Sequence, residues 1–340
     1  MLLVLCGCDK DAIGPQQVNQ CSSDSIAADP ATRVYIINEG NFTWGNASLS
    51  VYNTDGQTVS NNAFSTANGR PLGDVAQSIT LVGNTAYLVV NNSGKIEVLD
   101  GENLEARTTI TGLNSPRYLL PLSAKTAYVS DLYANSVSIL DRTSNIITGS
   151  IPIPGWTETM LRVNNEVFVV GTDANAIYVV DPVSHTLVGS IPVHIEPNSL
   201  VLDANGMLWT LCSGGFQEGL PALVEIDPAT HTVTRTFEFA DLQDTPISLC
   251  INAEGNQLMW VNGAVYQQAI AATTLSTTPW WEQEGSNLYR VAINPHNNEV
   301  YLSDPGNFVE EGEVLRLSPH GNPIDTIAVG IIPGNILFGT

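Results

Sequence analysis

Short runs of β-branched and aromatic residues alternate with turn-forming residues from position 33 to the end of the chain, and one such run recurs seven times. Successive copies are 52, 41, 40, 41, 51 and 41 residues apart. A period of this length, filled with strand-forming residues, is typical of repeats that contain four short strands each. The third residue of every copy is aromatic, and the seven aromatics are Tyr35, Tyr87, Tyr128, Phe168, Trp209, Trp260 and Tyr301.

The remaining strands are predicted around this anchor. An inner strand precedes it, as at 77–83, and a third strand follows it, as at 177–181, ending in the turn Asp181-Pro182. The chain enters the first repeat at its second strand, near Arg33, and its last residues, 335–340, match an inner strand. The pattern therefore predicts an all-β fold, a seven-bladed β-propeller of four-stranded blades, which the C-terminal strand closes by completing the N-terminal blade.

The segments before the repeats have a different character. Residues 1–8 are mostly apolar, and Leu5-Cys6-Gly7-Cys8 resembles a bacterial lipobox, so we expect a truncated export segment at 1–8 with lipidation at Cys8. A short buried strand is the alternative. Residues 9–30 are polar and are predicted to form a flexible tether, with the propeller at 31–340. No other segment is long and apolar enough to span a bilayer.

The charge balance narrows the range of partners. Lys and Arg number 12 against 34 Asp and Glu, which gives a formal net charge of -22. Such a surface disfavours nucleic acid, because affinity for nucleic acid comes largely from neutralising phosphates with Lys and Arg. It disfavours direct binding to anionic membranes for the same reason, so a lipid anchor is the only membrane attachment that we expect.

The insertions that lengthen the repeats favour one face of the propeller. We call this the top face: it collects the loops between second and third strands and the links from outer strands to the next inner strand. Aromatic and amide residues gather in these loops, which is how repeat folds acquire binding sites. Packing of these aromatics over the blade ends is the simpler alternative for any single one. The candidate ligand contacts are Phe42, Trp44, Tyr133, Trp156, Phe216, Trp281 and Phe308, with Asn92 and Arg117 as polar contacts.

Catalytic chemistry finds little support in the pattern. The five histidines do not converge, because four of them fall in bottom turns and only His194 lies in a top loop. Top-face carboxylates such as Glu39 and Glu158 could form an acid–base pair or ligate calcium, but a chain with 34 acidic residues brings some together on any face. We therefore predict a binding protein and not an enzyme, with no metal and no cofactor. Whether Cys212 and Cys250 pair stays open.

Two sets of residues resemble known families. Tyr178-Val179-Val180-Asp181-Pro182 and Ser190-Ile191-Pro192-Val193 resemble repeats of YncE-like propellers, over nearly all of residues 33–340. Ile37-Asn38-Glu39-Gly40-Asn41-Phe42, followed by Asn46-Ala47-Ser48-Leu49-Ser50, is similar to the first blade of the BtuG group of corrinoid-binding surface lipoproteins of Bacteroides-type bacteria.

The second resemblance implies a function. It implies a lipid-anchored protein, exposed on the outer membrane, that captures cobalamin or a related corrinoid and passes it to a TonB-dependent transporter of the BtuB type. Aromatic and amide side chains suit a ligand with a broad ring edged by amides. His194 could ligate the cobalt, although an exposed loop histidine is the simpler interpretation. The alternatives are a cell-envelope interaction or surface-layer-type propeller without a small ligand, or a carbohydrate or lactone hydrolase.

Overall fold

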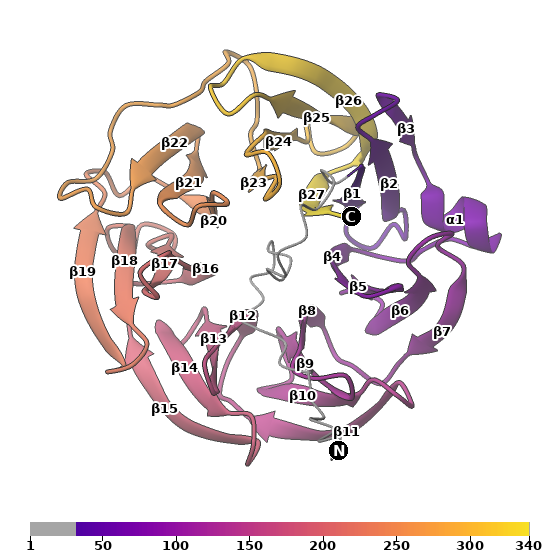
Figure 1. Cartoon of the computed structure of the whole chain (residues 1–340), viewed down its shortest axis with the longest axis horizontal. Helices are drawn as coiled ribbons and strands as arrows, with labels where there is room; N and C mark the ends of the chain where they lie inside the picture. Colours follow the sequence, from indigo (N-terminus) through magenta and orange to yellow (C-terminus); the bar gives the residue numbers. More distant parts are fainter. Residues whose placement is uncertain (1–31, 340) are drawn as a thin grey trace, which may run out of the picture.

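The computed structural model describes residues 32–339, which form seven antiparallel sheets around a central axis (Figure 1). The predicted seven-bladed β-propeller is confirmed. Blade one contains β27 (Pro333–Phe338), β1 (Arg33–Asn38), β2 (Ser48–Asn53) and β3 (Thr58–Ser60). Blade two contains β4 (Ala76–Val82), β5 (Thr85–Val90), β6 (Lys95–Asp100) and β7 (Ala106–Ile110). Blade three contains β8 (Pro116–Pro121), β9 (Thr126–Asp131), β10 (Ser136–Asp141) and β11 (Ile146–Pro152).

The later blades follow the same order from the axis outward. Blade four contains β12 (Thr157–Val163), β13 (Glu166–Gly171), β14 (Ala176–Asp181) and β15 (Thr186–Pro192). Blade five contains β16 (Pro197–Leu202), β17 (Leu208–Cys212), β18 (Ala222–Asp227) and β19 (Thr232–Glu238). Blade six contains β20 (Ile247–Ile251), β21 (Gln257–Asn262) and β22 (Ala264–Ala269). Blade seven contains β23 (Arg290–Ile293), β24 (Val300–Asp304), β25 (Glu311–Leu317) and β26 (Pro323–Ile331).

The hydrophobic core lies in the gaps between neighbouring blades. Each of seven buried clusters draws its residues from two adjacent blades, and the seven repeated aromatics are all buried within these clusters. Alternate residues of a strand point to opposite faces of its sheet, so each blade packs against both neighbours. The repeated aromatic marks this packing, and for that reason it recurs once per blade.

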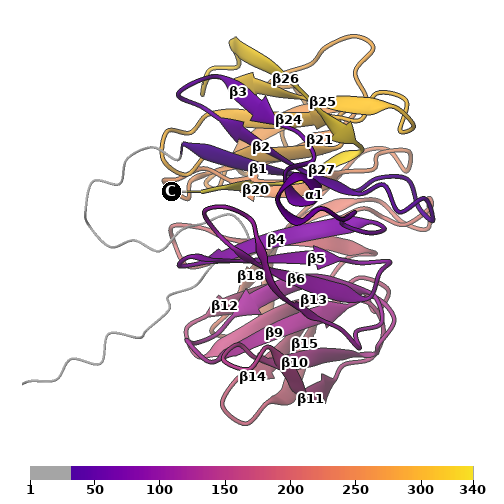
Figure 2. The same cartoon turned by 90° about the vertical axis from the view of Figure 1, so that its right-hand side faces the viewer.

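The ends of the described chain meet in blade one, as predicted. β27 pairs with β1 in antiparallel register, with Val34 opposite Phe338 and Ile36 opposite Ile336. Phe338 also packs edge-to-face on Tyr301 of blade seven, with ring centroids 5.1 Å apart. Figures 1 and 2 show β1 and β27 side by side although they lie at opposite ends of the described sequence. The first blade is therefore built from both ends of the propeller.

Two blades depart from the simple repeat. The link from blade one to blade two contains the short helix α1 (Ala63–Asn68), whose Phe64 is fully buried against both blades. In blade six the fourth strand is reduced to a single bridge, in which Trp281 pairs with Val265 of β22. The nearby Pro279 has no backbone N–H, which removes one donor that a regular outer strand would use.

Cys212 and Cys250 are free thiols, so the sequence-based question of whether they pair is answered. Cys212 and Cys250 are both buried and neither forms a disulfide. Burial raises the pKa of Cys212 to about 12 and also raises the pKa of Cys250. Both thiols therefore stay protonated and unreactive at neutral pH. The predicted lipidation site Cys8, the predicted export segment at 1–8 and the predicted tether at 9–30 lie outside the described residues.

Glu97 on β6 is fully buried, and three side chains donate hydrogen bonds to it. Arg70 donates to both carboxylate oxygens at 2.8 Å, Lys95 donates at 2.7 Å and Thr109 donates at 2.8 Å. Burial alone would raise the pKa of Glu97, but these donors outweigh it and hold that pKa at about 2. The ionised Glu97 thus ties the α1 link to β6 and β7.

This depressed pKa predicts how stability changes with pH. The ionised Glu97 stabilises the fold fully above its unfolded pKa of 4.5, and that contribution is lost as pH falls toward 2. At about 1.4 kcal/mol per pKa unit, the contribution is about 3 kcal/mol. We expect the free energy of urea unfolding to fall by about that much more between pH 5 and pH 2 in the native protein than in Glu97→Gln. The exposed Glu282→Gln should keep the native pH dependence, and an equal pH dependence in Glu97→Gln would contradict this role.

The closure of the ring leads to a second prediction. Phe338→Ala removes a buried ring that joins β27 to blade seven, so it should lower the free energy of unfolding by about 3–5 kcal/mol. Phe216→Ala makes the same chemical change at a side chain that is 98% exposed, and should change stability by less than about 0.5 kcal/mol. Urea unfolding of both variants measures the difference. Equal stabilities would mean that β27 does not close the ring.

Candidate functional site

The inner strands of the propeller carry an irregularity at the same end. The pairing register shifts at the top-face end of six of the seven inner strands, namely β4, β8, β12, β16, β20 and β27. A β-bulge of this kind re-aims side chains and is common beside functional sites. The residues within or beside these bulges include Gln77, Arg117, Tyr118, Glu158, Thr159, Asn198, Ser248, Leu249 and Asn335.

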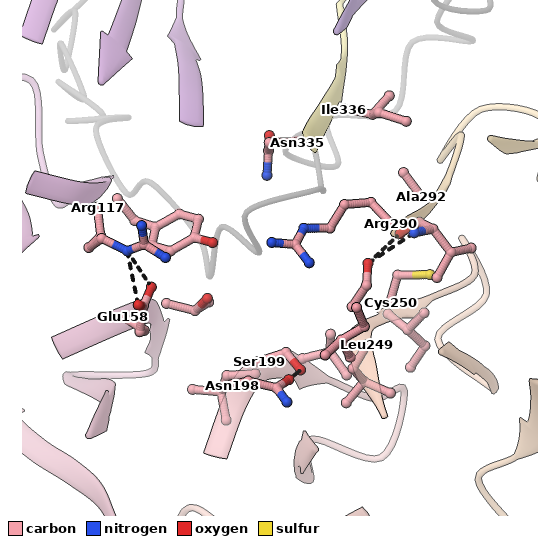
Figure 3. A pocket seen from close by; sticks show the side chains of 18 of the residues that line it. Arg117, Glu158, Asn198, Ser199, Leu249, Cys250, Arg290, Ala292, Asn335 and Ile336 are labelled. Atoms are coloured by element: carbon pink, nitrogen blue, oxygen red, sulfur yellow. Dashed lines mark hydrogen bonds and ion pairs between the residues drawn. The ribbon is translucent and has the colours of Figure 1, made fainter. Parts of the chain in front are cut away.

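All of these residues except Gln77 line a cavity of about 220 Å³ on the axis of the propeller (Figure 3). Its top is polar, with Arg117, Glu158 and Asn198 on one side and Arg290 and Asn335 on the other. We call these five residues the channel mouth. Leu200, Val201, Leu249, Ile251, Ala292 and Ile336 also line the cavity, although their side chains belong to the clusters between blades. Four of the five mouth residues thus come from bulged inner strands, whereas Arg290 comes from β23, which has no bulge.

Arg117 is held firmly on one side of the mouth. Its Nε donates to both oxygens of Glu158 at 2.9 Å, and its Nη1 donates to Gln77 Oε1. Burial by itself would lower the pKa of Arg117. The negative charge of the nearby Glu158 and the hydrogen bonds to it outweigh burial, so the pKa of Arg117 lies above its usual value. Gln77 in turn donates to the Tyr118 hydroxyl at 3.3 Å. Arg117, a predicted polar contact, is therefore a fixed cation at the mouth.

Arg290 stands across the cavity with looser partners. Its Nη1 donates to the Tyr289 carbonyl and its Nη2 to the Tyr289 hydroxyl, both at 3.2 Å, and its guanidinium lies 4.0 Å from the centre of the Tyr289 ring. The Tyr289 hydroxyl donates to Glu39 Oε1 at 3.0 Å. Burial raises the pKa of Tyr289 to about 12, so its hydroxyl stays protonated at neutral pH. Arg290 was not among the predicted contacts, although it begins an inner strand just as Arg117 does and is also one of only 12 cations.

The exposed aromatic side chains all lie on the top face. Within residues 32–339 six aromatic side chains are exposed, and every one is in a loop between second and third strands or in a link to the next inner strand. They are Phe42, Trp44, Tyr133, Trp156, Phe216 and Phe308. All six were predicted contacts, and the structure places them on the face that surrounds the channel mouth.

Outside the loop of Phe42 and Trp44, the exposed aromatic residues form two local groups and one isolated position. Tyr133 and Trp156 pack edge-to-face, with ring centroids 6.1 Å apart, between blades three and four. Phe308 packs edge-to-face on Tyr289 at 5.9 Å, and its carbonyl accepts a hydrogen bond from Asn41 Nδ2 at 2.9 Å. The second group therefore reaches from the loops of blades one and seven to the Arg290 side of the mouth. Phe216 projects alone from the loop of blade five.

The loop that carries Phe42 and Trp44 is fixed at both ends. Gly40, with φ +75, allows a close backbone approach, because a Cβ there would lie 2.6 Å from Ala47 N. Thr43 N donates to both oxygens of Asp74, at 3.1 and 3.0 Å, and Asn92 Nδ2 donates to the same carboxylate at 2.6 Å. Asn92, predicted as a polar contact, thus uses an amide donor to hold the loop that presents Trp44.

Trp281, the remaining predicted aromatic contact, is partly buried beside the top-face end of β22. Its backbone pairs with Val265, and its partly buried side chain packs against the core between blades six and seven. It lies beside Gly321, in the turn between β25 and β26. Trp281 therefore lies toward the outer edge of blade six, where a fourth strand would run, and not among the residues of the channel mouth.

The histidines and carboxylates of the described chain do not gather as a metal site. No group of three or more His, Cys, Asp or Glu residues within 32–339 is arranged to hold a metal ion. Two histidines of bottom turns contact the preceding blade instead: His185 Nδ1 lies 2.7 Å from the Tyr128 hydroxyl, and His231 Nε2 lies 2.9 Å from Glu166. His194 lies 3.9 Å from Glu238. None of the helices in this part of the chain has the length and hydropathy needed to cross a bilayer.

Comparison with known proteins places the chain in a family. Residues 33–317 match the model of a domain of unknown function, DUF5074, so the chain belongs to that family. No curated protein matches the sequence.

Solved structures with the same fold are distant in sequence. A quinonprotein alcohol dehydrogenase-like protein from Bacteroides thetaiotaomicron has a TM-score of 0.69 and 16% identity, over 91% of this chain and 78% of that one. A 6-phosphogluconolactonase-like protein from Bacteroides uniformis has a TM-score of 0.64 and 14% identity, over 91% and 100%. Dihydro-heme d1 dehydrogenase NirN, in complex with DHE, has a TM-score of 0.60 and 11% identity, over 96% and 80%. At these identities the likeness concerns the fold alone.

Proposed function

We propose that this DUF5074 propeller is a binding protein that holds a corrinoid on its top face. In this proposal it is anchored by a lipid at Cys8 on the surface of the outer membrane and passes its ligand to a TonB-dependent transporter. The observation that carries the proposal is the segregation of side chains. All six exposed aromatics of the described residues lie on the top face, where the polar channel mouth also lies, although none of the six lines the cavity itself.

The chemistry of this face suits a broad ring with polar edges. Aromatic side chains bury 150–250 Å² each at a low cost in conformational entropy, and apolar burial contributes about 25 cal/mol per Å². A corrin ring offers apolar faces of that kind and carries amide groups at its edge. Amides buried without partners would cost about 1–3 kcal/mol each, so polar groups beside the aromatics matter. Asn41 and Gln217 lie in the same loops as Phe42 and Phe216 and would supply such partners.

The cavity favours a small ligand over a purely structural role. The closed ring of blades produces the hollow in any case, but two arginines and two amide side chains line it here, and such polar groups suit a small ligand with polar edges. The NirN structure supports the same view, because its name describes a propeller relative that acts on a haem-type macrocycle. A cell-envelope interaction propeller without a small ligand is the alternative.

The arrangement of carboxylates supports binding over hydrolysis. A glycosidase or lactonase needs carboxylates that are free to exchange protons with a substrate. Both carboxylate oxygens of Glu158 accept a hydrogen bond from Arg117 Nε, and Glu39 accepts one from the Tyr289 hydroxyl. Both side chains are therefore committed to neighbours within the protein. This is the basis on which we propose a non-catalytic role.

A titration with cyanocobalamin, followed by calorimetry or by corrin absorbance, tests this proposal. We expect tight one-to-one binding by the native protein. The double variant Trp44→Ala, Trp156→Ala should bind at least tenfold more weakly, because it removes two exposed rings from separate loops of the top face. Val183→Ala, at an exposed apolar residue of a bottom turn, is the matched control and should bind as the native protein does.

Two outcomes would contradict the proposal. Absence of binding at micromolar corrinoid would exclude corrinoid capture and leave a protein or glycan partner as the better hypothesis. Unchanged affinity in the folded double variant would exclude the top face as the binding surface.

A further inference from the structure

Arg290 differs from the other ion-paired Lys and Arg side chains of the described residues in the distance to its carboxylate. Seven Lys and Arg side chains within residues 32–339 form ion pairs. Six of them approach a carboxylate oxygen within 2.9 Å, whereas Arg290 lies 3.9 Å from Glu39. That distance exceeds the range of a hydrogen bond. Arg290 is thus a cation whose charge is only loosely matched.

The position of Arg290 makes this loose pairing informative. Its side chain is 25% exposed, and that exposure is to the cavity that it lines. A charge withdrawn from bulk water is usually paired and hydrogen-bonded, because an uncompensated one is costly. Two hydrogen bonds to the adjacent Tyr289 use only part of a group with five N–H donors. The remaining donor capacity faces the cavity.

Other donors point to the same space. Arg117, on the opposite side, uses Nε and Nη1 for Glu158 and Gln77, and no described residue accepts from its Nη2. Figure 3 shows the Arg290 guanidinium directed into the cavity, with the amide of Asn335 on its rim. The Asn335 amide oxygen is buried without a hydrogen-bond partner among the described residues, so this amide also lacks its full set of partners. Figure 3 shows the Asn335 amide nitrogen directed toward the cavity, where it can donate a hydrogen bond to a bound group.

From this geometry we propose that the channel mouth is an anion subsite that binds a carboxylate or phosphate group between Arg290 and Arg117. The guanidinium of Arg290 presents paired N–H groups that match two oxygens of such an anion. Asn335 supplies an amide beside it. This subsite goes beyond the aromatic face, and it holds whether or not the ligand is a corrinoid.

The overall charge of the protein sharpens the inference. With a net charge of -22, the outer surface repels anions, so a general attraction for them is excluded. An anion that binds must therefore find a local arrangement of donors. Two of the 12 cations face one cavity of about 220 Å³, where the surrounding protein weakens screening by water and salt.

Calorimetric titration of the native protein with inorganic phosphate and, separately, with acetate tests this subsite. Both titrations are run at pH 7 and constant ionic strength, set with chloride. We expect saturable one-to-one binding of at least one anion, and the tighter of the two identifies phosphate or carboxylate as the preferred group. Arg290→Met should weaken that binding at least tenfold. Arg107→Met removes the same charge at an exposed ion pair with Asp100 and should leave binding unchanged.

A second variant separates binding from folding. Arg290→Lys keeps the charge but loses the planar pair of donors, so we expect binding at least threefold weaker in a protein that unfolds at the native temperature. The anion should also raise the thermal midpoint of the native protein, and raise it less in either Arg290 variant, because it binds only the folded state. No saturable binding of either anion, or equal weakening in Arg107→Met, would overturn the proposal. Corrinoid binding without anion binding would overturn the subsite alone.

Discussion

Packing between neighbouring blades is the interaction on which the rest of this structure depends. A single four-stranded sheet has two faces to bury and no means of burying them alone. Each of the seven clusters is shared by two blades, so no blade is stable without both neighbours. The ring must therefore close, and β27 provides the closure by pairing with β1. Once closed, the ring places the inner strands around one axis, and the central cavity follows from that geometry.

Bulges convert this closed ring into a site. In a regular inner strand, side chains would alternate toward the two neighbouring blades and none would be available for the axis. The extra residue at the top end of six inner strands breaks this alternation. Arg117, Glu158 and Asn198 line the cavity next to such breaks. The site is polar for the same reason, because side chains freed from the core no longer need to be apolar.

Features that recur in every blade could be predicted from the sequence, whereas features that occur in a single blade were harder to recognise. The buried aromatic at positions such as Tyr128 and Trp209 is visible because the same packing constraint acts in every blade. The top-loop aromatics were found because insertions interrupt the period. Trp281 is partly buried because it takes the place of a fourth strand, and in sequence a reduced fourth strand and an inserted loop look alike. Arg290 was missed because its loose pairing is visible only as a distance to Glu39, a residue far away in the sequence.

The distribution of charge links the fold to the proposed site. In a chain with so few cations, most arginines near the core have a close carboxylate, as Arg316 has Glu299 at 2.9 Å and Arg70 has Glu97 at 2.8 Å. In each of these pairs a carboxylate matches the charge of the arginine directly. Arg290 has no such close carboxylate, because the hydroxyl of Tyr289 donates the hydrogen bond to Glu39 instead. The guanidinium of Arg290 packs over the ring of Tyr289. A single tyrosine thus separates a structural ion pair from an arginine that is available to a ligand.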